Sequence, residues 1–433
     1  MILRSFAELL LQTSPSPGII GLHLKDTLAA FLVGATTSEG QALSRLHAGH
    51  AGAAELAAVT AAIVRLSECD DIHLESCVTP GAVVIPVALA FAGRSGEDDF
   101  NRAVAAGYAA GLRLGIAVGG AKALGGGVWP TLLAAPLMAA VTASCLSGHT
   151  PDQLAHAMAL ALGGASGRLG RPAGSPSGRW FLLGESVSKG VRASVAAGEG
   201  FRGDLALLSK PWLTAQAGHG DIDIAAFASS AGPALSQVGF KPFPMARQGI
   251  NAVIALKQLL SNGLDPALID SVEVFVPAVN VALLGRPLED GDRLSRLSNL
   301  GYQLACAALA PERLYDSARK EPPDAPLMDF ASRVKVSPSS ELEAYLPNRW
   351  AARVVVRASG RSIEETVIYT PLDYEARNLA ESLTEKWRRL LSPRDMADFP
   401  QAGVPDRAAI WKMIERRVSI AALTKYEPEP ARG

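Results

Sequence analysis

Residues 70–92 read DDIHLESCVTPGAVVIPVALAFA, and they place a polar loop directly before a long apolar segment. Two aspartates, a histidine and a glutamate crowd the loop, which ends in a Thr-Pro-Gly turn at residues 79–81. The apolar run that follows is typical of a buried helix, and the turn marks its start. The polar loop is then either the rim of an active site or the cap of that helix.

Outward from this stretch, the first half of the chain is a series of apolar segments separated by Gly, Pro and Ser. Ala and Leu dominate these segments and β-branched residues are sparse, which favours helices over strands. One helix start is well marked, because Thr150 is a good N-cap and Pro151 suits the first helical position. We expect helices at residues 21–34, 52–67, 81–93, 97–118, 130–147 and 151–163.

The pattern changes near residue 235. Three later segments alternate apolar and polar residues and are rich in β-branched side chains, so they predict strands of one sheet; they are 270–277, 350–358 and 365–371. We also expect helices that end at Gly263 and cover 297–310, and helices again from about residue 376. The predicted fold is therefore mainly α. A large all-helical domain, built from residues 1–235 and 376–433, is interrupted by a smaller α+β domain at 236–375.

Length and charge limit the classes of function. A chain of 433 residues is long for one hydrophobic core, so two domains are expected. The 41 basic and 42 acidic residues leave a net charge of −1, and no basic stripe is visible, so we expect no nucleic-acid partner. Charged residues make up only 19% of the chain, which indicates that much surface is hidden in a large core or against another subunit.

The most apolar window, residues 128–146, is long enough to span a bilayer. It contains Pro130 and Pro136 and lacks flanking basic residues, so we interpret it as a core helix and expect no membrane partner. The first residues lack the apolar region and cleavage site of a signal peptide. The four cysteines follow no metal-binding spacing and fit reduced thiols. These patterns predict a cytoplasmic protein without a metal site.

Six segments, in this order along the chain, resemble the MmgE/PrpD family, which includes 2-methylcitrate dehydratase, cis-aconitate decarboxylase and iminodisuccinate epimerase. They are residues 70–92, AVAAGYAAGLRLG (103–115), GVWPTLLAAPLMAA (127–140), KGVRASVAAGEGF (189–201), FKPFPMARQGINAV (240–253) and LGYQLACAALA (300–310). The resemblance covers nearly the whole chain. It implies a helical domain from both chain ends, an α+β lid, a site between them and a homodimer.

The same resemblance implies a chemistry. Family members remove a proton next to a carboxylate of a small-molecule substrate, then expel water or carbon dioxide or return the proton, and they need neither a metal nor a redox cofactor. The sequence departs from the family where it usually has histidines. Thr79 and Trp129 stand at two such positions, and a third falls on Ile250 when counted without gaps. Arg179 aligns with a family lysine. The chain is thus a divergent member without the usual catalytic histidines.

The remaining titratable residues suggest a reduced catalytic set. His73 lies beside Asp71, and an imidazole near carboxylates is expected to have a raised pKa and to serve as a base. Tyr302 matches a family tyrosine that donates a proton or hydrogen bond. We predict His73, Asp71 and Tyr302 as catalytic. The alternatives are that Asp71 caps a helix, that His73 is an ordinary loop residue and that Tyr302 packs in a core.

A second group of residues is suited to holding a carboxylate. Arg179 follows a Gly-, Ser- and Pro-rich loop at 164–178, which also carries Arg168 and Arg171 and resembles a loop that closes over a ligand. By resemblance, Lys241 and Arg247 face the same site. We predict Arg179, Lys241 and Arg247 as substrate-binding, together with Thr79 and Trp129, the latter as an apolar wall. A solvated linker, surface cations and a filled pocket are the alternatives.

Three function classes remain open from the sequence. A cofactor-independent lyase or isomerase acting on a carbon acid is the leading hypothesis. A non-catalytic member that binds a small molecule or acts as a dimeric scaffold is the alternative. A hydrolase lacks support because no nucleophile elbow is present. The Gly-rich segment 119–127 lacks the Lys-Ser/Thr of a phosphate loop, so a nucleotide site is not expected.

Overall fold

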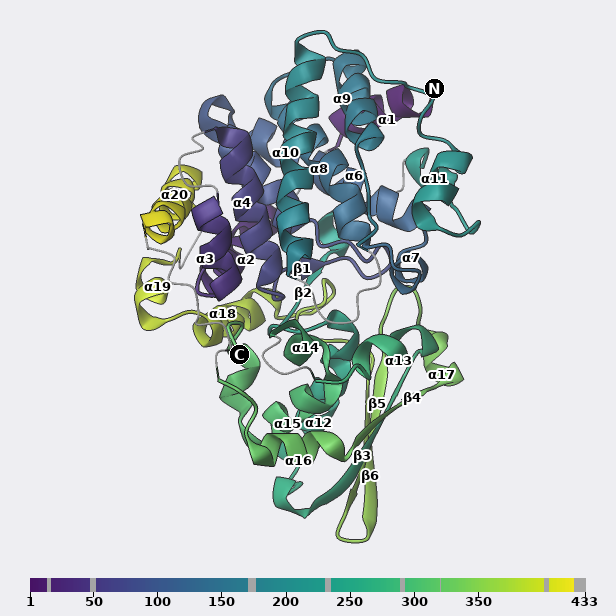
Figure 1. Cartoon of the computed structure of the whole chain (residues 1–433), viewed down its shortest axis with the longest axis vertical. Helices are drawn as coiled ribbons and strands as arrows, with labels where there is room; N and C mark the ends of the chain where they lie inside the picture. Colours follow the sequence, from purple (N-terminus) through teal and green to yellow (C-terminus); the bar gives the residue numbers. More distant parts are fainter. Residues whose placement is uncertain are drawn as a thin grey trace, which may run out of the picture.

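The structure is a computed structural model, and it describes residues 1–13, 17–46, 52–169, 177–229, 235–288, 293–319, 321–400 and 405–423. Two portions are stacked along the long axis of the molecule (Figure 1). The helical body is built from both ends of the chain, and the α+β portion is inserted between them. Each portion has a hydrophobic core of its own. The predicted fold class, mainly α with an α+β part, is confirmed.

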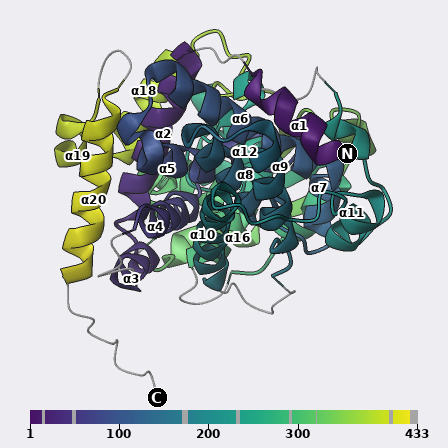
Figure 2. The same cartoon turned by 90° about the horizontal axis from the view of Figure 1, so that it is seen from above.

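The helical body contains the long helices of the first half of the chain and the last helices of the second half. From above, α19 and α20 lie along one flank of the body (Figure 2). The helices are α1 (Ile2–Leu11), α2 (Pro17–Gly34), α3 (Ser38–Leu46), α4 (Ala53–Leu66), α5 (Gly81–Phe91), α6 (Glu97–Ala117), α7 (Ala121–Gly125), α8 (Pro130–Leu146), α9 (Pro151–Gly163), α10 (Gly178–Gly198), α11 (Lys210–Ala217), α18 (Leu379–Leu390), α19 (Pro393–Asp398) and α20 (Arg407–Leu423).

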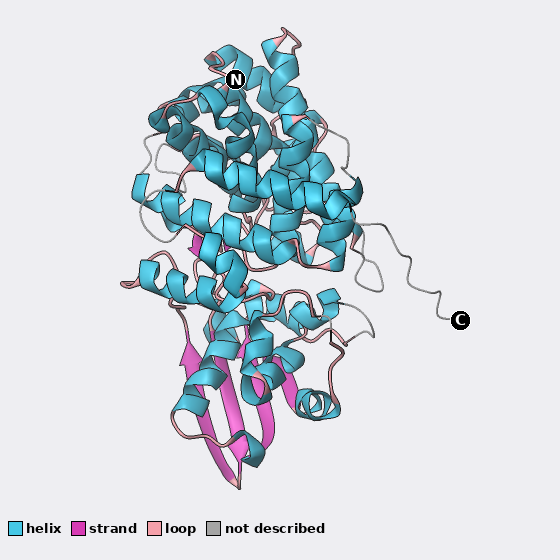
Figure 3. Cartoon of the chain, turned by 90° about the vertical axis from the view of Figure 1, so that its left-hand side faces the viewer, coloured by secondary structure: helices cyan, strands magenta, loops and turns pink. Residues whose placement is uncertain are grey.

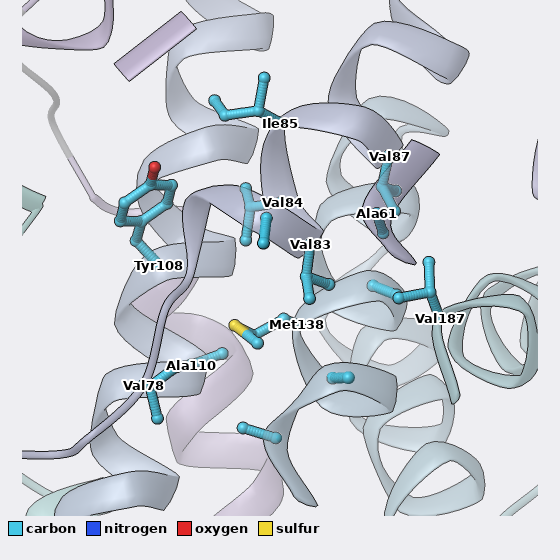
Figure 4. Packing of buried hydrophobic residues seen from close by; sticks show 14 of the residues in the cluster. Ala61, Val78, Val83, Val84, Ile85, Val87, Tyr108, Ala110, Met138 and Val187 are labelled. Atoms are coloured by element: carbon cyan, nitrogen blue, oxygen red, sulfur yellow. The ribbon is translucent and has the colours of Figure 1, made fainter. Parts of the chain in front are cut away.

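The apolar segment after the Thr-Pro-Gly turn is α5, and it lies in the middle of the body. It is buried from Gly81 to Leu89 and packs against α4, α6 and α8. Figure 4 shows Val83 and Val84 close to Met138 of α8. The most apolar window of the sequence is α8 itself, which is buried from Pro130 to Ser144 between α6 and α10. Both segments are therefore core helices, as their sequences predicted.

One helix start matches its sequence signal in detail. The Thr150 side chain accepts a hydrogen bond from the backbone of Gln153, and the Gln153 side chain accepts one from the Thr150 backbone, which completes a capping box before α9. No single helix among the described residues is long and apolar enough to cross a membrane. Helices α2 and α3 together have the length and composition of a span, but they are bent by 96° at their junction.

The α+β portion is a four-stranded sheet with helices packed on it (Figure 3). The strand order is β4-β3-β5-β6, with β3 and β4 parallel and the other neighbours antiparallel. Helix α12 packs against β5 and β6, and α15 contacts β4. The elements are α12 (Arg247–Ser261), β3 (Ile269–Val276), α13 (Ala278–Leu284), α14 (Arg293–Ser298), α15 (Leu300–Leu309), α16 (Ala325–Ser332), β4 (Val334–Pro338), α17 (Ser340–Glu343), β5 (Ala352–Ala358) and β6 (Arg361–Val367).

The sequence predicted three of these strands, but it missed one strand and some element boundaries. Strand β4 was not predicted, since VKVSP is short and contains a proline. Strand β6 begins earlier than the expected segment 365–371, because Ser359 and Gly360, with φ of 48° and 74°, form a two-residue turn directly after β5. The expected helix 297–310 is divided at Asn299, whose side chain caps α15 by accepting from the backbone of Tyr302.

A short antiparallel pair of strands links the two portions. Strand β1 (Asp71–Ile72) pairs with β2 (Gly239–Phe240), with Asp71 opposite Phe240 and Ile72 opposite Gly239. Extending this register by one residue places Asp70 opposite Lys241. The polar loop of the opening stretch is thereby fixed against the entrance to the α+β portion.

Helix packing in the body depends on the absence of a side chain at Gly190 of α10. A Cβ there would stand 2.2 Å from the carbonyl oxygen of Pro136 in α8. We expect Gly190→Ala to reduce the free energy of unfolding by about 3 kcal/mol, since the clash is with backbone. Gly178 on the same helix has nothing within 4 Å, so Gly178→Ala should change stability by less than about 1 kcal/mol. Urea unfolding of both variants checks this, and equal effects would contradict it.

Candidate functional site

A small cavity of about 100 Å³ lies between the helical body and the α+β portion; we call it the cleft pocket. Strands β1 and β2 cross beside it and bring both portions to its wall. Cationic side chains dominate the polar part of this wall. Its lining residues are Arg65, Glu68, Ile72, Cys77, Thr79, Leu124, Trp129, Arg179, Lys241, Ala246, Arg247, Gln248, Leu283, Arg286, Leu294, Leu297, Ser298 and Trp350.

The five residues predicted to bind substrate all line the cleft pocket. They come from four separate parts of the chain: Thr79 before α5, Trp129 before α8, Arg179 in α10, and Lys241 with Arg247 around the start of α12. The structure therefore brings this predicted group together. Its role in binding a substrate remains a prediction.

Four ionisable side chains form a buried cluster at one end of the pocket. Lys241 Nζ lies 3.1 Å from Glu68 Oε2 and 3.2 Å from Asp70 Oδ1. Arg65 Nη1 lies 2.9 Å from the same Glu68 oxygen and 3.4 Å from Asp70 Oδ1. All four side chains are buried. Two basic and two acidic side chains meet here across the boundary between the two portions, and burial raises the pKa of Asp70.

Glu68 is the carboxylate of this cluster that lines the pocket. Burial opposes its ionisation, but the charges of Arg65, Lys241 and Arg179 outweigh burial and hold the pKa of Glu68 well below its usual range. Its backbone is left-handed, with φ of 57°, and its carbonyl accepts a hydrogen bond from the backbone of Met245. A non-glycine residue in this conformation costs free energy, so its position is fixed by its surroundings.

Arg179 and Trp129 form a second feature of the pocket. The guanidinium of Arg179 lies 4.5 Å from the centroid of the Trp129 ring, and that of Arg65 lies 5.2 Å from it. Arg179 makes no ion pair with a described residue, and its buried Nε has no hydrogen-bond partner among them. Burial, with Arg65 and Arg286 nearby, lowers the pKa of Arg179 to about 10. The group is therefore charged at neutral pH, and the charge of Glu68 acts on it without forming a direct ion pair.

The other two binding predictions have partners of their own. Arg247 donates to Asp373 Oδ1 at 2.9 Å and to Asn251 Oδ1 at 3.0 Å, so its charge is compensated. The backbone N–H of Thr79 donates to Thr131 Oγ1 at 3.1 Å, and the two hydroxyls lie 3.3 Å apart. Both residues can present polar groups to a ligand, but neither has a free charge.

His73 is not among the lining residues, and the prediction that its pKa is raised is wrong. Its Nδ1 accepts a hydrogen bond from the backbone N–H of Ser76 at 3.2 Å and lies 3.0 Å from the Ser76 hydroxyl. Burial lowers the pKa of His73 to about 4. The carboxylates that adjoin it in sequence point elsewhere, so desolvation decides its charge. His73 is neutral near pH 7 and stabilises its loop.

Asp71 also lies outside the pocket wall, and the alternative that it caps a helix is correct. Its Oδ1 accepts from the backbone N–H of Gly81, the first residue of α5, at 2.9 Å. Its Oδ2 accepts from the Tyr108 hydroxyl at 2.7 Å and lies 2.8 Å from His23 Nδ1. Burial, followed by the charge of Asp71, raises the pKa of Tyr108, so this hydroxyl keeps its proton. Asp71 therefore links the start of α5 to Tyr108 and His23 within the body.

Tyr302, the third catalytic prediction, packs in the core of the α+β portion and does not line the pocket. Its side chain is buried, and burial together with neighbouring Cys306 raises its pKa to about 12. The Arg319 guanidinium lies 5.8 Å from its ring centroid. Ser298, at the end of the preceding helix, lines the pocket instead. The register of α15 turns the tyrosine into this core.

Several other residues named in the sequence can be compared with the structure. Ile250 is buried in the α+β core, whereas Ala246 and Gln248 line the pocket. Arg168 is exposed and not part of the wall, and Arg171 lies outside the described residues. Cys77 lines the pocket, but burial raises its pKa to about 12, which makes it a poor nucleophile. Within the described ranges, no group of three or more His, Cys, Asp or Glu could hold a metal ion.

Sequence reasoning missed Arg65, Glu68 and Arg286 as pocket residues. Glu68 and Arg65 lie just before the opening stretch, and their i, i+3 spacing was a usable signal for an ion pair at a helix end. Arg286 follows α13 and had no signal, because only the fold brings that loop to the pocket.

The architecture is that of a helical body and an inserted α+β portion with a charged pocket between them. Residues 18–224 match the MmgE/PrpD N-terminal domain, and residues 243–398 match the MmgE/PrpD C-terminal domain. The chain belongs to the MmgE/PrpD family, which includes lyases such as dehydratases. A search of curated proteins finds no match to this chain.

The lowered pKa of His73 has a consequence for stability. Between pH 6.5 and about 4, His73 is protonated in the unfolded chain but not in the folded chain. The contribution of neutral His73 to the free energy of unfolding is therefore complete above pH 6.5 and is lost as the pH falls. We expect the stability difference between wild type and His73→Gln to shrink by about 2–3 kcal/mol from pH 7.5 to 4.5. Urea unfolding at both pH values measures it. A raised pKa would give the opposite sign.

Replacing Asp71 tests its structural role. Asp71→Ala leaves the Tyr108 hydroxyl and the Gly81 N–H without their partner, so we expect a loss of about 3 kcal/mol or more in the free energy of unfolding. Asp99→Ala, which removes an exposed carboxylate paired with Arg102, should cost less than about 1 kcal/mol. Equal losses in the two variants would show that Asp71 is not a structural centre.

Proposed function

We propose that this protein is a lyase or isomerase that acts on a small organic anion bound in the cleft pocket. The observation that carries the proposal is the unpaired, half-buried guanidinium of Arg179, which faces a pocket rich in cations. Arg286 lines the same pocket and makes no ion pair with a described residue. Leaving such charges near one another is unfavourable, and a carboxylate ligand would relieve it.

Glu68 is the group best placed to take a proton from the substrate. Among the described lining residues it is the only carboxylate, and none of them is a histidine or a tyrosine. In the free protein Arg65 and Lys241 keep its pKa low and make it a weak base. An anionic substrate that binds these same cations reduces their pull on Glu68 and raises its basicity. Binding of the substrate would thus activate the base.

Lys241 supplies the complementary acid. Its ammonium group hydrogen-bonds Glu68 and Asp70, so it is held at the pocket wall. In a dehydration, the carbon-bound proton passes to Glu68, its electron pair forms the carbon–carbon double bond, and hydroxide leaves as water with a proton from Lys241. In an epimerisation, solvent water returns a proton to the other face of the carbanion, because Glu68 and Lys241 lie 3.1 Å apart and meet the substrate from one side.

The size of the pocket bears on how a substrate enters. A volume of about 100 Å³ is below the roughly 300–1,000 Å³ of common ligand sites. The described arrangement therefore corresponds to a closed cleft. We propose that the α+β portion moves away from the body to admit a substrate and that the ion pairs around Lys241 re-form on closure.

A non-catalytic binding protein is the second candidate, and one observation favours it. The pocket wall, within the described residues, has lost the imidazoles that the family usually carries, while its cations persist. Such a protein would bind the same class of anion through Arg179 and would not exchange its carbon-bound protons with solvent.

The experiment is incubation with 2-methylcitrate, cis-aconitate and iminodisuccinate in deuterated water, with deuterium incorporation and products followed by NMR. Binding is followed separately by calorimetry. We expect Arg179→Gln to abolish binding, and Glu68→Gln to keep binding but slow exchange by about 100-fold or more. Glu97→Gln, an exposed change on α6, is the control. Binding without exchange in wild type would favour the second candidate, and no binding of any anion would overturn both.

A further inference from the structure

A second hollow of the described chain is larger than the cleft pocket. It is a groove of about 920 Å³ between α12 of the α+β portion and α18 of the helical body; we call it the interdomain groove. No residue of the sequence analysis pointed to it. Ile254, Tyr315 and Pro371 supply its apolar surface, with Phe243 and Leu372 almost fully buried behind them, and α18 contributes charged side chains such as Arg389. Its volume falls within the range of common ligand sites.

A cation without a partner lies in this groove. Lys257 of α12 is partly buried, and its ammonium makes no ion pair or hydrogen bond with a described residue. Burial and the nearby charge of Arg389 lower its pKa. Glu365 and Glu381 also line the groove, but neither pairs with Lys257.

The other groove cations already have partners. Lys386 donates to Asp26 Oδ1 at 2.6 Å and to the Cys69 carbonyl at 2.7 Å, so it is bound to the helical body. Arg389 donates to Glu385 Oε1 at 2.7 Å, and its guanidinium lies 5.3 Å from the ring centroid of Tyr315. Lys257 is thus the free cation of the described groove, beside apolar side chains and an aromatic ring.

We propose that the interdomain groove is a second binding site, for a monocarboxylate with an aliphatic or aromatic body. Lys257 pairs with the carboxylate, and Ile254, Tyr315 and Pro371 contact the hydrocarbon. The chemistry differs from that of the cleft pocket. The polar part of that pocket's lining is mostly guanidinium groups, and its volume of about 100 Å³ is too small for an apolar chain.

The groove and the pocket share their supporting elements. In the turn before α12, Lys241 lines the pocket while Pro242 and Phe243 line the groove. On α12, Arg247 lines the pocket and Lys257 the groove. Leu372 in the groove directly precedes Asp373, the partner of Arg247. A ligand that fills the groove contacts α12 and α18 together, so it stabilises the closed arrangement of the two portions and regulates access to the pocket.

Binding is tested on the full chain with 8-anilinonaphthalene-1-sulfonate, a fluorescent anion with an aromatic body, and with hexanoate and 1-hexanol as competitors. We expect hexanoate to displace the dye at a concentration at least tenfold lower than 1-hexanol. Lys257→Glu should weaken dye binding at least tenfold. Lys412→Glu, the same charge change at an exposed position of α20, should change it less than twofold. Dye binding by Lys257→Glu at wild-type affinity would overturn the site.

Two further measurements separate this inference from the proposed function. Arg179→Gln should leave dye binding within twofold of wild type, and loss of dye binding there would show that the dye occupies the cleft pocket instead. Hexanoate should slow backbone hydrogen exchange at residues 239–245 in wild type and not in Lys257→Glu. Exchange that does not respond to hexanoate would overturn the regulatory part. None of these readouts needs catalytic activity, so they hold even if the cleft pocket is inactive.

Discussion

The contact between Lys241 and the two carboxylates of Glu68 and Asp70 joins the two portions of this molecule at the point where its chemistry is proposed to occur. The β1–β2 register fixes it, since Asp70 precedes one strand and Lys241 follows the other. Breaking one side of a buried ion pair leaves an uncompensated charge, so the cluster can persist only as a whole. Cleft geometry, pocket charge and the position of α12 all follow from this connection.

Much of the fold was predictable, and the reason is local. Segments such as 81–93 and 130–147 are continuously apolar and rich in Ala, so burial and helix propensity agree. The alternating pattern at 270–277 and 350–358 gave two strands of the sheet almost to the residue. Strand β4 escaped notice because its stability comes from its parallel partner β3, which no pattern within five residues can reveal.

The residues predicted to bind substrate and those predicted to be catalytic had different outcomes. Cations predicted to bind an anion do line one pocket, because Arg and Lys are buried where they face a cavity or a counter-ion. The predictions for Asp71 and His73 rested on their proximity in the sequence, but the structure gives the two side chains different partners. Asp71 is held by Tyr108 and the start of α5, and His73 turns back to Ser76. Burial then lowered a pKa that neighbouring acids were expected to raise.

The turn that carries Lys241 and Phe243 presents its two side chains to different cavities. A substitution at either residue will therefore affect both the cleft pocket and the interdomain groove. Saturation mutagenesis scored by a single phenotype would merge two separate effects into one map. Two assays, one for each cavity, are needed to decide which cavity each residue of this turn affects.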